Sequence, residues 1–218
     1  MPATARWPTV RSVALPTEPG GWGLTLVPGI VGVLLAPSVA GVLLAVAALL
    51  AFLLRTPLRL VLWRRLRPGE RTSTETGTAR KQLASQVAIV ELLAIGFALA
   101  GTAALAEDPG WIWPLVIATP MFAIALLFDL RASSRHLVPE IVGSVAVAAV
   151  AAMGTLAGGG SGALALGAWL ILSARVISSI PHVRAQVRRI HGREAPPQAG
   201  LIGDVAALGT AAVAVVLE

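Results

Sequence analysis

Long stretches without charge are the feature of this sequence that most limits its fold. No charged residue occurs from Leu24 to Leu54, and further apolar runs follow between residues 84 and 181. Of the 218 residues, 56% are hydrophobic and 13% are charged, and the mean hydropathy is +0.80. A helix needs about 20 apolar residues to cross roughly 30 Å of hydrocarbon. The sequence therefore predicts an all-α, polytopic transmembrane helical bundle, with residues 1–218 forming a single transmembrane domain.

The apolar runs and the turn residues between them predict about seven spans. We place them at residues 22–36, 39–56, 84–105, 111–128, 138–157, 162–181 and 199–217. The first two form a hairpin, because the uncharged run is too long for one span and Pro37 and Ser38 provide a turn within it. Residues 1–20 then form a cytoplasmic N-terminal arm, and residues 64–82 form a cytoplasmic loop.

Basic residues give the bundle an orientation. Of the 17 Lys and Arg residues, eight lie from Arg55 to Lys81, and the rest fall in the N-terminal arm, in residues 129–140 and in residues 175–194. The intervening turns have none. Because cytoplasmic loops collect Lys and Arg, we expect a membrane protein with a cytoplasmic N-terminus and an external C-terminus. The net charge of +6 is spread over these short clusters, which argues against nucleic-acid binding.

Ionisable residues within the predicted spans are candidates for function, since such groups are costly in lipid. Glu91 lies in the third span, Asp204 begins the seventh, and Arg175 lies within the sixth. Arg175 also begins a polar stripe at helical spacing, which continues through Ser179, His182, Gln186 and Arg189. The stripe favours a helix that lines a wet cavity, and the alternative is a helix that enters the cytosol while Arg175 reaches the interface.

A weak internal repeat places acids and arginines at corresponding positions. Arg55 and Arg64 are nine residues apart, as are Arg175 and Arg184, and an acid precedes each pair by about two spans. Both halves would have the same orientation, as in parallel transporter repeats. The repeat predicts a cytoplasmic collar of acids and arginines, which consists of Glu18, Arg55, Asp129, Glu140 and Arg175.

Arginines in such a collar can bind a phosphate or carboxylate through paired hydrogen bonds. The candidates are Arg55, Arg131, Arg135 and Arg175, with Ser179 as a further polar contact. The alternative is topological, since arginines gather at the cytoplasmic ends of spans whether or not a ligand binds there.

Several segments resemble the YwiC-like family of bacterial membrane proteins. They are residues 15–23, Pro28, residues 36–38, residues 51–58 and residues 128–131. In the family pattern a histidine follows the N-terminal glutamate, whereas this chain has Pro19 there. The layout is similar to that of UbiA-type prenyltransferases, which implies a cavity open to the cytoplasm that binds a polyprenyl diphosphate through Mg²⁺ and aspartates. This chain lacks an aspartate-rich run, so we assign no metal ligands.

Three functions stay open from the sequence. The first is a transferase or lipid-processing enzyme for an isoprenoid or other amphipathic phosphate, with Asp129, Glu140 and Glu18 as catalytic residues. The second is a small-molecule or ion transporter that uses the same cavity, with Glu91 and Asp204 on the ion pathway. The third is an accessory membrane protein without a small-molecule site. Membrane lipid is the expected partner, and neither a cofactor nor an oligomeric state is assigned.

Overall fold

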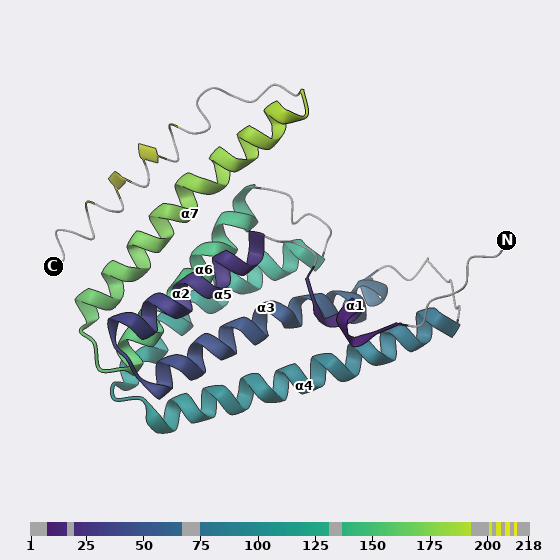
Figure 1. The fold of residues 1–218 in the computed structure, drawn as a ribbon, viewed down its shortest axis with the longest axis horizontal. Helices are drawn as coiled ribbons and strands as arrows, with labels where there is room; N and C mark the ends of the chain where they lie inside the picture. The colour runs from purple at the N-terminus through teal and green to yellow at the C-terminus, as the bar shows by residue number, and fades with distance from the viewer. Residues whose placement is uncertain are drawn as a thin grey trace.

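The fold is a bundle of antiparallel helices, seen here in a computed structural model (Figure 1). The structure describes residues 8–16, 20–66, 75–130 and 137–192, together with residues 201, 204, 205, 208, 209 and 212. Within these parts the helices are α1 (Val10–Ala14), α2 (Gly20–Leu35), α3 (Val39–Leu66), α4 (Glu75–Leu105), the 3-10 helix η1 (Pro109–Trp111), α5 (Ile112–Leu130), α6 (Leu137–Ala157) and α7 (Gly162–Ile190). The described residues contain no strand, and the predicted all-α bundle is confirmed.

Five of these helices are long and apolar enough to cross a membrane. Their apolar segments are Val39–Leu62, Gly77–Leu105, Pro109–Phe128, Leu137–Ala157 and Gly162–Ile190. A sixth apolar segment, Gly21–Leu35 in α2, is shorter. These six correspond to the first six predicted spans. The seventh, residues 199–217, lies mostly outside the described residues.

The predicted spans match one end of each helix closely. At the opposite end, α3, α4 and α7 extend beyond the predicted spans. α3 continues to Leu66, α4 starts at Glu75 and α7 continues to Ile190, so residues 64–66 and 75–82 of the segment predicted as a loop are helical. Hydropathy marks where lipid contact ends, whereas helical hydrogen bonds continue through Arg, Lys, Gln and Leu, which are good helix formers. Pro57 and Pro181 lie inside α3 and α7 without ending either helix.

Three turns meet at one end of the bundle, which we call the closed end. It comprises residues 36–38, 106–111 and 158–161. The Glu107 N–H donates to the Ala157 carbonyl oxygen at 3.0 Å, and a Cβ on Gly158 would lie 2.4 Å from the Ala36 carbonyl oxygen. Ser38 starts α3 by accepting a hydrogen bond from the Gly41 N–H at 3.0 Å. From this end the helices fan out toward the opposite, open end (Figure 1).

Helix α6 is the centre of the bundle. It packs against α2, α5 and α7, and every residue from Ala151 to Ala157 is buried. Helices α2 and α6 touch through their backbones, since a Cβ on Gly154 would lie 3.2 Å from the Gly32 Cα. Glycine at this position therefore serves close helix packing.

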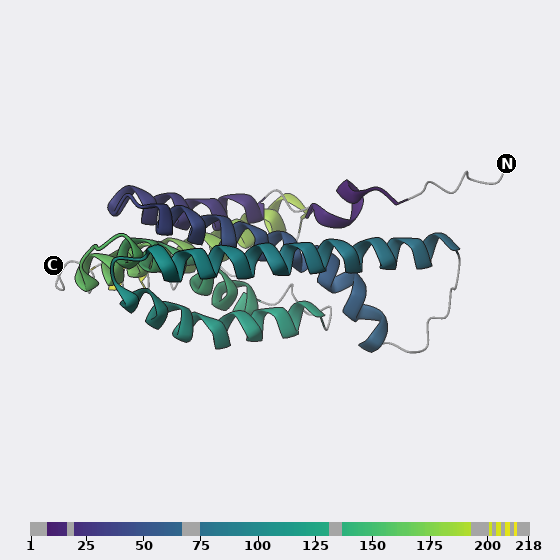
Figure 2. The same cartoon turned by 90° about the horizontal axis from the view of Figure 1, so that it is seen from below.

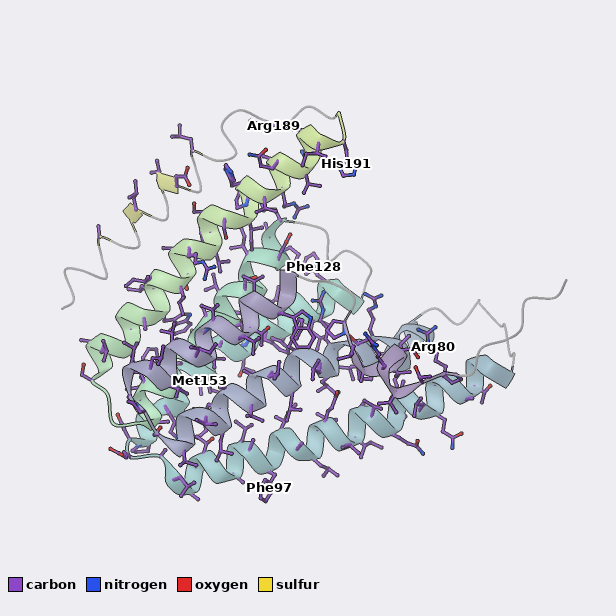
Figure 3. All side chains as sticks on the ribbon, viewed as in Figure 1. Arg80, Phe97, Phe128, Met153, Arg189 and His191 are labelled. Atoms are coloured by element: carbon purple, nitrogen blue, oxygen red, sulfur yellow. The ribbon has the colours of Figure 1, made fainter. Side chains whose placement is uncertain are left out.

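Helices α3 and α4 form a long pair along the side of the bundle. In the view turned by 90°, α4 crosses in front of the bundle, with α2 above it and α5 below it, and α3 passes behind it (Figure 2). Phe97 is 80% exposed and points away from the bundle beneath α4, as expected of a lipid-facing residue (Figure 3). Short helix α1 packs on α3 and α4, with Val13 fully buried, so part of the predicted N-terminal arm is docked on the bundle.

The position of Trp169 within α7 is explained by packing. Its Nε1–H donates to the Val145 carbonyl oxygen at 2.9 Å, and its ring lies 5.8 Å from that of Trp113 between centroids. Trp169 therefore packs against the neighbouring helices α5 and α6.

Candidate functional site

A cavity of about 860 Å³ opens among helices α2 to α7. Each helix contributes residues at helical spacing. On α3 the lining residues are Leu44, Ala47, Ala48, Ala51, Phe52 and Arg55, and the three alanines leave room that larger side chains would fill. A volume of this size is in the range of sites for one small organic ligand, which is roughly 300–1,000 Å³.

The cavity is deep and mostly apolar. Its wall on α6 extends from Glu140 to Met153, which corresponds to about 20 Å at the helical rise of 1.5 Å per residue. Met153 lies toward the closed end (Figure 3). Around it, Leu44, Val147 and Val150 form an apolar inner part. The charged lining residues all lie toward the open end.

An ion pair lies at the end of the cavity toward the open end of the bundle, which we call the mouth. Arg184 Nη1 on α7 donates to Glu140 Oε2 on α6 at 2.7 Å, and the side chains of Arg184 and Glu140 are 30% and 41% exposed. Arg55 lines the same cavity from α3. Because Arg55 and Arg184 come from different helices, the mouth presents two guanidinium groups and one carboxylate around one opening.

Aromatic side chains border this mouth on the α2 side. The rings of Trp22 and Phe52 meet edge to face with centroids 5.5 Å apart. Gly21 lies directly against Phe52, since a Cβ there would be 2.6 Å from the ring. The absence of a side chain at Gly21 thus lets Phe52 lie between α2 and the cavity.

Three of the predicted site residues line the cavity together: Arg55, Glu140 and Ser179. Arg175 does not line it and is exposed. The nine residues from Arg175 to Arg184 correspond to about two and a half helical turns, so the two side chains point to opposite faces of α7. Glu140 therefore pairs with Arg184, whereas the repeat associates it with Arg175.

The polar stripe of α7 faces mainly outward. Arg175, His182, Gln186 and Arg189 are all exposed, and Arg189 lies near the far end of α7 (Figure 3). Ser179 is the one member that lines the cavity. The cavity face of α7 is instead offset around the helix and includes Ile180, Val183 and Arg184.

The remaining predicted residues lie elsewhere. Glu18, Arg131, Arg135 and the side chain of Asp129 are outside the described residues. Asp204 is exposed and accepts a hydrogen bond from Ser178 on α7 at 2.5 Å, away from the cavity lining. Among the described residues, no group of three or more His, Cys, Asp or Glu side chains could hold a metal ion.

Glu91 is buried within α4. It is 7% exposed, and its Oε2 atom has no hydrogen-bond partner in the described part of the chain. It does not line the cavity, but Ile95, one turn further along α4, does. Glu91 is therefore a buried acid next to the cavity wall, within a predicted membrane span.

Sequence reasoning did not assign Arg184 and Ser144 to the site. Arg184 appears in the repeat, but the polar stripe drew attention to the opposite face of α7. Ser144 follows Gly143 in α6 and carries no charge, so its sequence position resembles that of a packing residue. Helical phase points to Ser144, because it follows Glu140 on the cavity face by about one turn, whereas Arg184 is five residues after Ser179 and so lies about 140° around α7 from it.

The bundle of apolar spanning helices defines an integral membrane protein with a cavity inside its helical domain. Residues 15–155 match the family described as YwiC-like protein, and the chain belongs to this family. No curated protein and no solved structure matches the chain.

Proposed function

We propose that this protein is a transferase or lipid-processing enzyme that acts on an isoprenoid or other amphipathic phosphate at the cytoplasmic leaflet of the bacterial inner membrane. One observation carries the proposal: a single cavity has charged residues at its mouth and about 20 Å of apolar wall behind them. A molecule with an anionic head and a hydrocarbon chain fits this order. The basic residues at the open end favour its location at the cytoplasmic side.

The lining residues have distinct roles in this proposal. Arg55 and Arg184 hold the phosphate, since a guanidinium group forms paired, charge-assisted hydrogen bonds with phosphate oxygens. The apolar wall between Leu44 and Met153 holds the chain. Glu140, already in contact with Arg184, would accept the proton of an acceptor hydroxyl group as its oxygen bonds to phosphorus, and would return that proton to the lipid oxygen as the bond from phosphorus to that oxygen breaks. We derive no step through Mg²⁺, because the described residues provide no set of ligands for it.

Lipid binding can be tested with the arginine at the α3 wall. We expect native mass spectrometry of the purified protein to detect a bound long-chain phosphate, and Arg55→Gln to weaken its binding by about tenfold or more. Arg59→Gln is the matched control, because Arg59 is exposed one turn further along α3 and does not line the cavity. Equal losses in both variants would contradict a site at the cavity mouth.

Catalysis needs a separate measurement. Protein in nanodiscs would be incubated with a labelled polyprenyl phosphate, and with a labelled lipid phosphate, in the presence of membrane extract. We expect a new lipid product that Glu140→Gln abolishes while binding persists. If both labelled phosphates bind but neither gives a product, the protein binds lipid but is not an enzyme for these substrates.

A second candidate function is transport through the same cavity. The observation that favours it is the buried Glu91, whose Oε2 atom lacks a partner within the described residues. Buried acids in spans often carry protons or ions. If the protein is a proton-coupled transporter, Glu91→Gln abolishes pH-driven flux in proteoliposomes but leaves lipid binding intact. Flux that is unchanged in this variant would exclude Glu91 as the carrier.

A further inference from the structure

Four threonine hydroxyl groups within the spans are bonded to the backbone of their own helices. Thr25, Thr102, Thr119 and Thr155 each donate to the carbonyl oxygen four residues earlier, at 3.1, 2.9, 2.7 and 2.8 Å. This is the expected arrangement in lipid, where no water is present and the nearest acceptor is the helix's own backbone. Two of these residues, Thr25 and Thr119, line the cavity, so access to the cavity does not by itself prevent the bond.

Ser144 and Ser179 lack such a bond, as Ser173 does, but unlike Ser173 they line the cavity. Both line the cavity and both are half-buried, yet no hydrogen bond joins either hydroxyl to the described part of the chain. We call them the serine pair. A half-buried hydroxyl without a partner in an apolar surrounding costs free energy, which a ligand oxygen can recover. Each hydroxyl is thus available as a donor or an acceptor.

The serine pair lies at one level of the cavity. Glu140 and Arg184 are in contact and fix the register of antiparallel helices α6 and α7. Ser144 is four residues from Glu140 toward the closed end, and Ser179 is five residues from Arg184 in the same direction. At the helical rise these steps are about 6 Å and 7.5 Å, so both serines lie one turn inside the ion pair.

The lining therefore has three successive layers. The charges of Arg55, Glu140 and Arg184 come first, the serine pair second, and apolar residues such as Val147, Val150 and Met153 third. A polyprenyl phosphate has only carbon directly behind its phosphate and would leave the second layer without partners. An acylated glycerol phosphate has ester and hydroxyl oxygens there, between the phosphate and the hydrocarbon chain.

We infer that the ligand of this cavity is an acylglycerol phosphate, whose ester or hydroxyl oxygens hydrogen-bond to Ser144 and Ser179. The inference rests on the proposed function, since it needs the phosphate at Arg55 and Arg184. It narrows the substrate class from any amphipathic phosphate to one with an oxygen-bearing linker. It also assigns a binding role to Ser144.

The test compares three ligands that share an anionic phosphate. Oleoyl glycerol phosphate has the linker, oleyl phosphate has a matched chain without it, and geranylgeranyl phosphate is the isoprenoid counterpart. Each is titrated into the purified full-length protein in nanodiscs and followed by tryptophan fluorescence or native mass spectrometry. We expect the glycerol lipid to bind roughly tenfold or more tightly than the other two, which corresponds to about two hydrogen bonds.

Variants separate the serine pair from general effects. The double variant Ser144→Ala/Ser179→Ala is expected to bind oleoyl glycerol phosphate as weakly as oleyl phosphate, with no change for oleyl phosphate itself. Ser173→Ala is the matched control, because Ser173 lies on α7, is buried, forms no hydrogen bond within the described residues and does not line the cavity. We expect it to bind like the unaltered protein.

The outcomes are distinguishable. If the three phosphates bind with equal affinity, or the double variant keeps the preference for the glycerol lipid, the inference is overturned while the phosphate site stands. If geranylgeranyl phosphate binds most tightly, the ligand is an isoprenoid and the inference is again wrong. If none of the three binds, the proposed function itself fails.

Discussion

The two ends of the bundle are built from the same helices but pack very differently. At the closed end, backbones touch through Gly32, Gly154 and Gly158, and the last two turns of α6 are completely buried. At the open end the same helices separate around the cavity, where α6 presents Glu140 and α7 presents Arg184. The distance between helices thus follows the size and charge of the residues that face inward.

The two ends therefore differ in what they contribute to the bundle. The closed end holds the helices together, because close packing of small residues is a main source of helix association in lipid. At the open end the helices lie around the cavity and present polar groups to it instead. Changes at the closed end should therefore alter stability, and changes at the open end should alter binding.

The largest effect is expected at the closed end. Gly158→Ala places a Cβ 2.4 Å from the backbone oxygen of Ala36, which cannot move aside as a side chain could. We expect the free energy of unfolding in detergent to fall by about 3 kcal/mol, at the upper end for overpacking. Gly167→Ala is the control, since a Cβ there meets nothing within 4 Å. Equal stability of the two variants would mean that the turns are not tightly joined.

The next effect belongs to the open end. Arg184→Gln removes the ion pair with Glu140 and one of the two guanidinium groups at the mouth. We expect affinity for a long-chain phosphate to fall by about tenfold to a hundredfold, since hydrogen bonds to charged groups contribute roughly 1.5–3 kcal/mol. Binding would be measured by titration in nanodiscs.

Arg175→Gln is the matched comparison for this variant, because Arg175 lies on the opposite face of the same helix. We expect it to bind normally. A larger loss for Arg175→Gln than for Arg184→Gln would favour the sequence-based collar over the cavity mouth.

A smaller effect of opposite sign is expected along the wall between the two ends. Glu91→Leu replaces a buried carboxyl group that has an unpartnered Oε2 atom with an apolar side chain of similar size. We expect the free energy of unfolding to rise by about 1 kcal/mol, because the cost of the buried polar group is removed. Glu91→Gln, which stays polar, should gain less. Destabilisation by leucine would show that the carboxyl group has a structural partner.

The smallest effect concerns the first turn of the closed end. Ser38→Ala removes the side-chain cap of α3, in which the hydroxyl oxygen accepts from the Gly41 N–H. We expect a loss of about 0.5–1 kcal/mol in thermal unfolding, with no change in lipid affinity. Ser85→Ala, inside α4, serves as the reference. A change in lipid affinity would show that the two ends are coupled.

The sequence predicts the helices well because hydropathy and turn residues are local signals. Pro37 and Ser38 mark the α2–α3 turn, and the Gly158–Gly162 segment marks the start of α7 at Gly162. The predicted spans cover α3, α4 and α7 only in part, because a helix does not end where its lipid contact ends. Residues 10–14 gave no comparable signal, because their burial depends on contacts with distant α3 and α4.

The candidate site was only partly predictable. Arg55, Glu140 and Ser179 were chosen for charge and spacing and do line one cavity. The choice between Arg175 and Arg184 needed the face of α7, and helices that are apolar all around give little indication of which side turns inward. The sequence alone does not distinguish Ser144 from a packing residue, because its place in the cavity wall depends on how α6 packs against the other helices.

The tightly packed turns of the closed end also hold one end of each helix, so that a tilt moves the opposite end most. With its start held at Ser161, α7 carries Arg184 at the end of an arm of about 33 Å. A tilt of only about 5° then moves the guanidinium group by about 3 Å, whereas Leu172, near the middle, moves half as far. Small tilts of the helices would thus widen the mouth and leave the deep part of the cavity almost unchanged.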